Sequence, residues 1–448
     1  MISLAKKIGA LFLGLALTVA AAGGGYYAYT VLSPDPVVVT QSEQGAVITR
    51  KSKVDVPEVS TINEKLSPKT VVSDEDDALQ DEFAEEDAEA INSVELPYAV
   101  GYFTEKLTED EQIVCRELYK GIYDHKEKIG LKPDVINSED VCQLIVMVVT
   151  CSPDMDYIGK DYSIQVNAEG YATGVMMNYT MTEEEIEERR EQMQQRIEQI
   201  CAEITPAWSD MQKYKLIHDA VVNGCEYSED SDDCYSPYGC LVEGKAVCEG
   251  YSKAVMMLCD YAEIECLPVV GEAFNEGGSF QSHLWNKIRI EDAWYVTDVT
   301  WDDPVMDTAD NYLRYDYFTM TDEECERNHA VDENRFFNYP ECNSTFHDYY
   351  IYNGYYAENF DGAFRAFDNA VRDAVINNED YARIKCSDEE CYEQTLNWVY
   401  SNGIGSDALF TLIEDRAEKQ GNESYDASSY SVINDEVMHC ITLRLKRK

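Results

Sequence analysis

Positive charge is scarce in this sequence. The 448 residues include 36 Lys and Arg against 86 Asp and Glu, which gives a formal net charge of −50 at pH 7. Such a surface repels phosphate backbones, so no nucleic acid is expected as a partner. We interpret the excess acid as a source of solubility. No segment has the spaced Asp and Asn ligands and the glycine of a calcium loop, which disfavours a calcium-regulated enzyme.

Paired CxxC units, the usual signature of a structural zinc site, are also missing, so we predict no metal and no cofactor. The sequence nevertheless has fifteen cysteines. In an exported protein this odd number suggests one free nucleophile and up to seven disulfides, whose pairing the sequence does not give. The alternative is that the cysteines are reduced and act as small buried hydrophobes.

The first 32 residues have the layout of an export signal. Lys6 and Lys7 precede an uncharged, mainly apolar run from Ile8 to Leu32. This run is long enough to cross a bilayer, and Ala22 and Gly23 would also suit a cleavage site. We predict a signal peptide or a membrane anchor over residues 1–32, which places the rest of the chain outside the cytoplasm, either anchored or secreted.

The composition of the sequence after residue 32 changes along the chain and suggests a linker followed by folded regions. Residues 33–95 contain several prolines and an acidic run, and are predicted to be a disordered linker. With 45% hydrophobic and 11% aromatic residues overall, the rest can bury two or three cores. We expect an α/β flank over 96–205, a core over 206–330 and a C-terminal α/β unit over 331–448. The expected helices lie near residues 109–122, 141–149, 182–201, 363–376 and 389–400, and the expected strands near 162–166, 174–179, 345–356, 381–385 and 440–445.

One cysteine lies where a helix is expected to begin. After Cys248, the residues Tyr251, Ala254, Val255 and Leu258 recur with helical spacing. The free N–H groups and the positive end of the helix dipole favour a thiolate at such a position, and can also hold an oxyanion. Cys248 is therefore the candidate nucleophile.

A hairpin downstream supplies the candidate base. Residues 283–290 and 294–301 are strand-like, and Glu291 and Asp292 form a short turn between them. A two-residue turn would pair His283 with Thr300, and would make His283 and Asp298 diagonal neighbours on one face, roughly 7–8 Å apart at the backbone. Asp298 would then hold the ring of His283, and His283 would take the proton of Cys248.

The stretch from Tyr214 to Pro304 resembles the transglutaminase-like superfamily, in its bacterial secreted branch. The matching pieces are residues 215–219 (KLIHD), 246–254 (AVCEGYSKA), 283–286 (HLWN) and 294–304 (WYVTDVTWDDP). The resemblance implies an α+β, papain-like core with Cys248 as nucleophile, His283 as base and Asp298 as third member. His218 fits a motif position, but its apolar helical neighbours favour a structural role. We predict no function for His125, His329, His347 or His439.

Acyl transfer from a peptide or glutamine amide through a thioester is the function that these residues imply. Hydrolysis and cross-linking use the same residues, and the branch favours hydrolysis of a peptide or protein by analogy. The alternative from another class is a non-catalytic extracellular binding or adhesion module. The complete triad argues against that alternative, since a binding module is free to lose it.

Overall fold

The computed structural model describes residues 38–42, 45–49, 67–73, 91–167, 169–274, 280–303, 313–332, 334–401 and 403–448, the first three segments by their backbone only. The predicted signal or anchor over residues 1–32 lies outside these residues. Within the described part of the chain, no helix combines the length and apolar character needed to cross a membrane.

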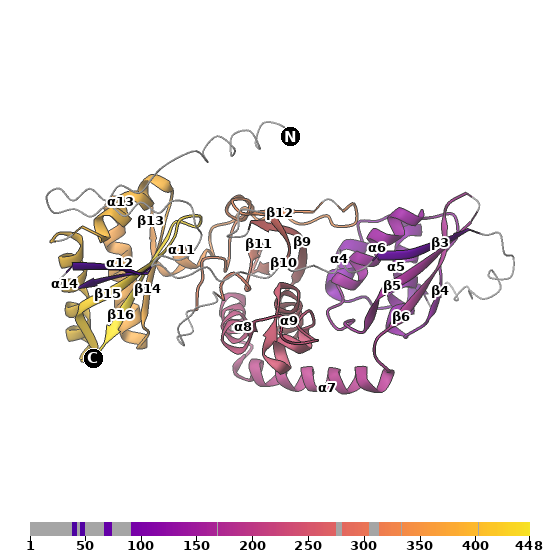
Figure 1. Cartoon of the computed structure of the whole chain (residues 1–448), viewed down its shortest axis with the longest axis horizontal. Coiled ribbons are helices and arrows are strands. Elements are labelled where there is room, and N and C mark those ends of the chain that lie inside the picture. Colours follow the sequence, from indigo (N-terminus) through magenta and orange to yellow (C-terminus); the bar gives the residue numbers. More distant parts are fainter. Residues whose placement is uncertain are drawn as a thin grey trace. The chain divides into compact units, whose positions relative to one another are not determined.

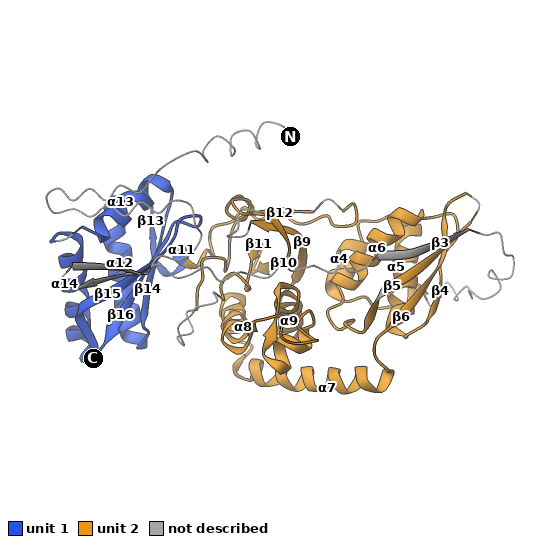
Figure 2. Ribbon diagram, viewed as in Figure 1, with its two compact units in different colours: residues 1–53, 350–448 blue, residues 54–349 orange. Residues whose placement is uncertain are grey.

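The chain divides into two compact units (Figure 2). One comprises residues 54–349, and the other comprises residues 1–53 together with 350–448. The predicted boundary at residue 330 is therefore wrong, because the following segment packs on the core. Lys287 donates to the Pro340 carbonyl at 2.7 Å, and the Tyr295 hydroxyl lies 2.8 Å from that of Ser344.

The predicted flank lies within the larger unit. Its helices are α4 (Tyr98–Thr104), α5 (Glu109–Tyr123) and α6 (Ser138–Thr150), and its strands β4 (Lys128–Gly130), β5 (Ile158–Val166) and β6 (Ala172–Tyr179) form a sheet of order β3-β5-β6-β4. Helix α7 (Glu183–Ile200) follows (Figure 1). The side chains of Thr108 and Thr182 cap α5 and α7 reciprocally with a glutamate three residues on. The helices and the hairpin predicted here are confirmed.

The predicted linker contains three strands. Strands β1 (Val38–Ser42) and β2 (Gly45–Thr49) pair with each other, and β1 pairs with a strand of the C-terminal unit. Strand β3 (Ser67–Ser73) runs parallel to β5. A continuous disordered linker over 33–95 is thus incorrect at these strands. They are rich in Val and Thr, whose β-branched side chains favour strands, and the composition of the whole segment concealed them.

The centre of the larger unit is α+β and papain-like. Helices α8 (Asp210–Gly224) and α9 (Cys248–Tyr261) pack together, and α9 also packs on β9 (Cys266–Phe274) and β10 (Phe280–Ile290). With β11 (Ala293–Thr297) and β12 (His329–Val331), these strands form a sheet of order β11-β10-β9-β12. The π-helix η3 (Gly239–Glu243) and the short parallel strands β7 (Glu226–Tyr227) and β8 (Lys245–Ala246) precede α9.

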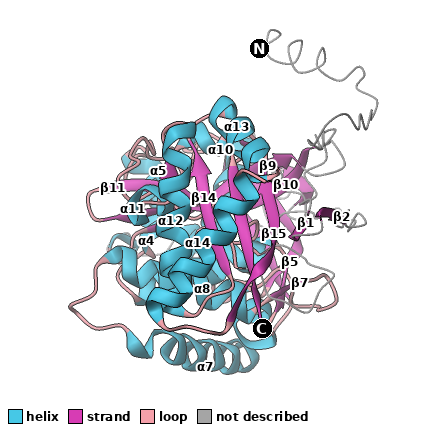
Figure 3. Ribbon diagram, turned by 90° about the vertical axis from the view of Figure 1, so that its left-hand side faces the viewer, coloured by secondary structure: helices cyan, strands magenta, loops and turns pink. Residues whose placement is uncertain are grey.

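The second unit is a six-stranded sheet of order β13-β14-β16-β15-β1-β2. Its strands β14 (Tyr381–Cys386), β15 (Tyr425–Asp435) and β16 (Cys440–Arg447) share one buried apolar core with helices α12 (Phe360–Asn377), α13 (Glu389–Val399) and α14 (Gly405–Gln420). Figure 3 shows α12 and α14 against this sheet. The helices predicted near 363–376 and 389–400 and the strands predicted near 381–385 and 440–445 are confirmed, whereas α14 and β15 were not predicted.

The tyrosine-rich segment over 345–356 was expected to be strand-like, which is wrong. It forms the helical turn α11 (Tyr349–Asn353), and only Tyr356–Ala357 (β13) is extended. Gly354 ends α11 with a φ of 74°, and the Tyr355 N–H donates back to the Tyr350 carbonyl at 2.7 Å. This C-terminal cap stabilises a helix against the strand preference of the aromatic residues.

All fifteen cysteines are present as thiols rather than disulfides. Fourteen are buried and Cys142 is half-buried. The predicted disulfides are therefore absent from this structure, and the alternative of reduced, buried thiols describes it.

Gly271, in the middle of β9, is the position where the core sheet tolerates no side chain. A Cβ added there would collide with the Ala330 carbonyl oxygen on β12 and lie 2.7 Å from the Trp285 ring. We expect Gly271→Ala to lower the free energy of unfolding by about 2 kcal/mol, since the backbone of β12 must move. Gly101→Ala in α4, where a new Cβ meets nothing closer than 3.9 Å, is the matched control. Urea unfolding of both variants tests this, and equal stability would contradict it.

Candidate active site

Cys248 is the first residue of α9, as predicted. The preceding residue, Val247, provides no side-chain cap, so the first N–H groups of the helix are left for another acceptor. The Cys248 side chain is only 1% exposed and packs with Cys234 and Val247, and Tyr227 and Tyr235 cover this cluster. The sulfur thus lies at the positive end of a helix, in an almost dry environment.

The hairpin places His283 beside Asp298. Strands β10 and β11 pair Asn286 with Thr297 and Ile290 with Ala293, which is the register that a two-residue turn at Glu291 and Asp292 requires. The Nε2 atom of His283 lies 2.6 Å from Oδ2 of Asp298. The two side chains thus lie next to each other in the predicted register, although β11 ends one residue before Asp298.

Helix α9 brings Cys248 to the same histidine. It packs across β10, and the Cys248 sulfur acts electrostatically on the His283 ring, favouring its protonated form. Because Nε2 of the ring faces Asp298, Nδ1 is the nitrogen available to the sulfur. The structure therefore brings together all three residues that the sequence singled out.

Electrostatics favour charge on both partners of the His–Asp pair. Burial opposes a proton on His283, but the Asp298 carboxylate and the Cys248 thiolate outweigh it and raise the pKa of His283 to about 10. Burial likewise opposes ionisation of Asp298, yet His283 and His329 hold the pKa of that carboxyl well below its usual range. At neutral pH the pair is an imidazolium beside a carboxylate.

A second histidine reaches Asp298, and the sequence did not suggest it. Nε2 of His329, on β12, lies 3.0 Å from the same Oδ2 atom that contacts His283. The ring of His329 is 4% exposed and lies 4.7 Å from that of Trp301 and 5.0 Å from that of Trp285. No local pattern marks this residue, since β12 has three residues and Asp298 is 31 positions away.

His283, Asp298 and His329 also bring three possible metal-ligand atoms within 4.8 Å of one another. The same atoms already form the two hydrogen bonds at 2.6 and 3.0 Å. We therefore interpret the cluster as a hydrogen-bonded network centred on one carboxylate, in which the lone pairs that a metal would need are used by N–H donors.

His218 has the structural role predicted for it. It is fully buried on α8 and lies 3.1 Å from both Asp219 and Asp302, which together outweigh its burial and raise its pKa. Asp302 also accepts the Tyr317 N–H at 3.0 Å. His218 therefore braces the turn that follows Asp298.

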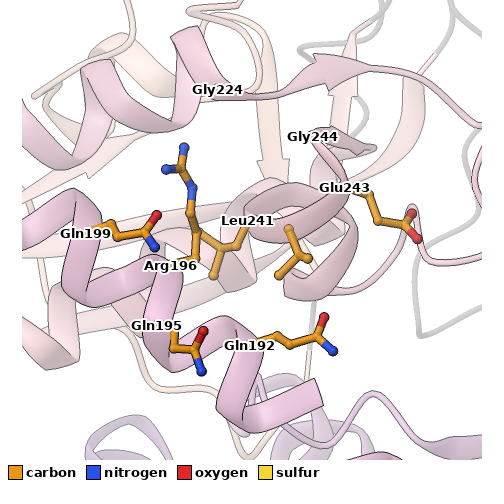
Figure 4. A pocket seen from close by; sticks show the side chains of 9 residues that line it. Gln192, Gln195, Arg196, Gln199, Gly224, Leu241, Glu243 and Gly244 are labelled. Carbon is orange, nitrogen blue, oxygen red and sulfur yellow. The ribbon is translucent and has the colours of Figure 1, made fainter. Parts of the chain in front are cut away.

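A cavity of about 440 Å³ lies elsewhere, between α7 and η3 (Figure 4). Its lining is mainly polar, with Gln192, Gln195, Arg196 and Gln199 on α7 opposite Leu241. Neither Cys248 nor His283 nor Asp298 lines it, so this cavity is separate from the candidate active site.

Comparison with known proteins identifies the core. Residues 198–299 match the model of the transglutaminase-like superfamily. This segment belongs to that superfamily. The match includes Cys248, His283 and Asp298, so the candidate site lies within the transglutaminase-like domain.

Two curated relatives are the kyphoscoliosis peptidases of Mus musculus and Homo sapiens, 26% and 25% identical over 123 residues. These matches cover 25% of this chain, and the chain spans 19% of the length of either relative. Matched solved structures include a TGase (15% identity, 42% of this chain, 52% of that chain, TM-score 0.23). Another is a cysteine protease described as putative, from Cytophaga hutchinsonii (19% identity, 29% of this chain, 51% of that chain, TM-score 0.22).

The raised pKa of His283 predicts a pH-dependent contribution to stability. The folded protein binds this proton more tightly than the unfolded chain, whose histidine has a pKa near 6.5. The contribution is therefore complete below about pH 6.5 and is lost as the pH rises towards 10. We expect the difference in unfolding free energy between wild type and His283→Gln to narrow between pH 6 and pH 10, because groups that do not interact with His283 titrate alike in both proteins. Urea unfolding at both pH values checks this; a constant or widening difference would be inconsistent with the ion pair.

Proposed function

We propose that the transglutaminase-like domain transfers the acyl group of a peptide or glutamine amide to Cys248. The observation that carries the proposal is the Cys248 thiol at the start of α9, which acts electrostatically on His283, while Nε2 of that histidine lies 2.6 Å from a buried carboxylate. Such an arrangement activates a thiol without a metal ion.

In the proposed reaction, the Cys248 sulfur forms a bond to the carbonyl carbon, and the carbonyl π electrons move to oxygen. The backbone N–H groups at the start of α9 stabilise this oxyanion. The carbon–nitrogen bond then breaks, and His283 gives its proton to the departing amine. The resulting thioester is cleaved by a second nucleophile, whose proton returns to His283.

We propose Tyr227 as a second oxyanion donor, a group that the sequence analysis did not locate. It packs against the cluster that contains Cys248, and its hydroxyl has no hydrogen-bond partner within the described part of the chain. Burial and the nearby Cys248 thiolate raise the pKa of Tyr227 well above its usual range, so the hydroxyl keeps its proton and can donate it.

Water is the second nucleophile that we favour, which makes the protein a peptidase or amidase. The name of the curated relatives, kyphoscoliosis peptidase, supports this choice for a shared segment of 123 residues. A lysine amine in place of water would give a cross-link with the same residues.

We further propose an extracytoplasmic location. Lys6 and Lys7 before the apolar run to Leu32 support it. Protease protection of whole cells, or fractionation, tests this part; a chain found only in the cytosol would exclude it.

Loss of the nucleophile should abolish turnover. We expect Cys248→Ala to lose all release of amine from a casein or glutamine-peptide substrate while its urea unfolding stays close to wild type, since one sulfur atom is removed. Cys142→Ala, at a half-buried thiol in α6, is the matched control and should keep activity. Adding a lysine analogue separates hydrolysis from transfer by the product formed. Turnover by Cys248→Ala, or none by wild type on any amide, would favour the binding module.

Tyr227→Phe tests the second donor. Removing one hydrogen bond that forms only in the transition state should lower kcat by roughly a hundredfold with little change in KM. Tyr261→Phe, at the exposed end of α9, is the control and should match wild type. An unchanged kcat for Tyr227→Phe would remove this residue from the mechanism.

A further inference from the structure

We infer that His329 is a positioning residue, which holds the Asp298 carboxylate so that His283 stays oriented and charged beside Cys248. The inference rests on the proposed function and adds a residue to it. Its central observation is that one oxygen, Oδ2 of Asp298, lies 2.6 Å from Nε2 of His283 and 3.0 Å from Nε2 of His329.

The sheet delivers both histidines to the same face. His283 on β10 is paired with Gly271 of β9, and His329 on β12 is paired with Ala273. Positions 271 and 273 are two residues apart, so they and their partners point to one face of the sheet. Because glycine and alanine leave that face of β9 nearly bare, the two imidazole rings can approach each other, to 5.5 Å between centroids.

The remaining oxygen of Asp298 is also occupied. Oδ1 accepts the N–H groups of Thr300 at 3.0 Å and Trp301 at 3.3 Å. An ionised carboxylate only accepts hydrogen bonds, and here four donors surround its two oxygens. The carboxylate can therefore neither rotate nor readily take a proton from His283, and Nδ1 of His283 stays directed at the sulfur.

His329 is itself fixed from behind. Its Nδ1 lies 2.7 Å from the Asn328 side chain, whose amide nitrogen donates to the Tyr317 hydroxyl at 2.9 Å. Burial lowers the pKa of His329, whereas its hydrogen bond to the Asp298 carboxylate opposes that shift. The other titratable side chains that act on Asp298 or His283 are Cys248, Tyr227 and Cys325.

The reactivity of Cys248 reports this role without knowledge of the substrate. The purified protein is treated with iodoacetamide from pH 5 to 9, and the alkylated peptides are mapped. In wild type, Cys248 should react fastest of the fifteen thiols and well below the pH of about 8.5 at which a free thiol ionises. His329→Phe keeps a buried ring without an N–H donor; its Cys248 should react roughly tenfold more slowly at pH 6, with a profile moved towards that of a free thiol.

His329→Gln is the rescue variant, since its amide nitrogen can still donate to Asp298. We expect it to retain most of the wild-type rate at pH 6. His329→Asn has the same amide on a shorter side chain that falls short of Asp298, and should behave as His329→Phe does. The Gln and Asn pair keeps the test decisive if His329→Phe does not fold, as judged by urea unfolding.

The outcomes distinguish a failure of the proposed function from a failure of the proposed role of His329. If Cys248 of wild type is no faster than the other thiols, the activated nucleophile and hence the proposed function fail. If Cys248 of wild type is fast and the folded Phe and Asn variants give the same pH profile, the proposed function stands and the role of His329 is overturned. A slow Gln variant equal to the Asn variant would also overturn it, because the donor would then not be the property that matters.

Discussion

The ionised carboxylate of Asp298, 1% exposed, is the constraint on which the core depends. An isolated charge at that depth would be strongly destabilising, so every lone pair must find a donor. Two histidines and two backbone N–H groups provide those donors. The fold of the transglutaminase-like domain can be understood as the means by which β10, β12 and the turn after β11 bring these donors to one carboxylate.

Each segment meets that requirement through a local feature. The two-residue turn after β10 sets which face His283 occupies, and the bare face of β9 admits β12 with His329. Val247, which lacks a capping side chain, leaves the start of α9 open for the Cys248 sulfur. The site thus depends on the missing side chain at Gly271 and on the missing capping hydrogen bond at Val247 as much as on Cys248, His283 and Asp298 themselves.

Much of the fold and of the candidate site could be predicted from the sequence because it depends on patterns within short stretches of residues. Helix starts, the hairpin turn and the alternation along β10 are encoded within a few residues, and these patterns, together with the resemblance to the transglutaminase-like superfamily, singled out Cys248, His283 and Asp298. His329 could not, because β12 is three residues long and gains its position only by pairing with β9. The same reason applies to β1 and β2, which are stabilised by a sheet nearly 400 residues further along the chain.

Although basic residues are scarce in this chain, histidines stabilise the turn that contains Asp298. The chain has six histidines and a net charge of −50. Three of these histidines contact Asp298 or Asp302, the two buried aspartates near the ends of the turn over 298–303. His283 and His329 hold Asp298, and His218 holds Asp302, whose N–H donates to the Asp298 carbonyl at 3.2 Å. Because both ends are held by imidazole, the turn has little freedom to move. A shift of α8, which carries His218, would therefore change the position of Asp298 and, through it, that of His283.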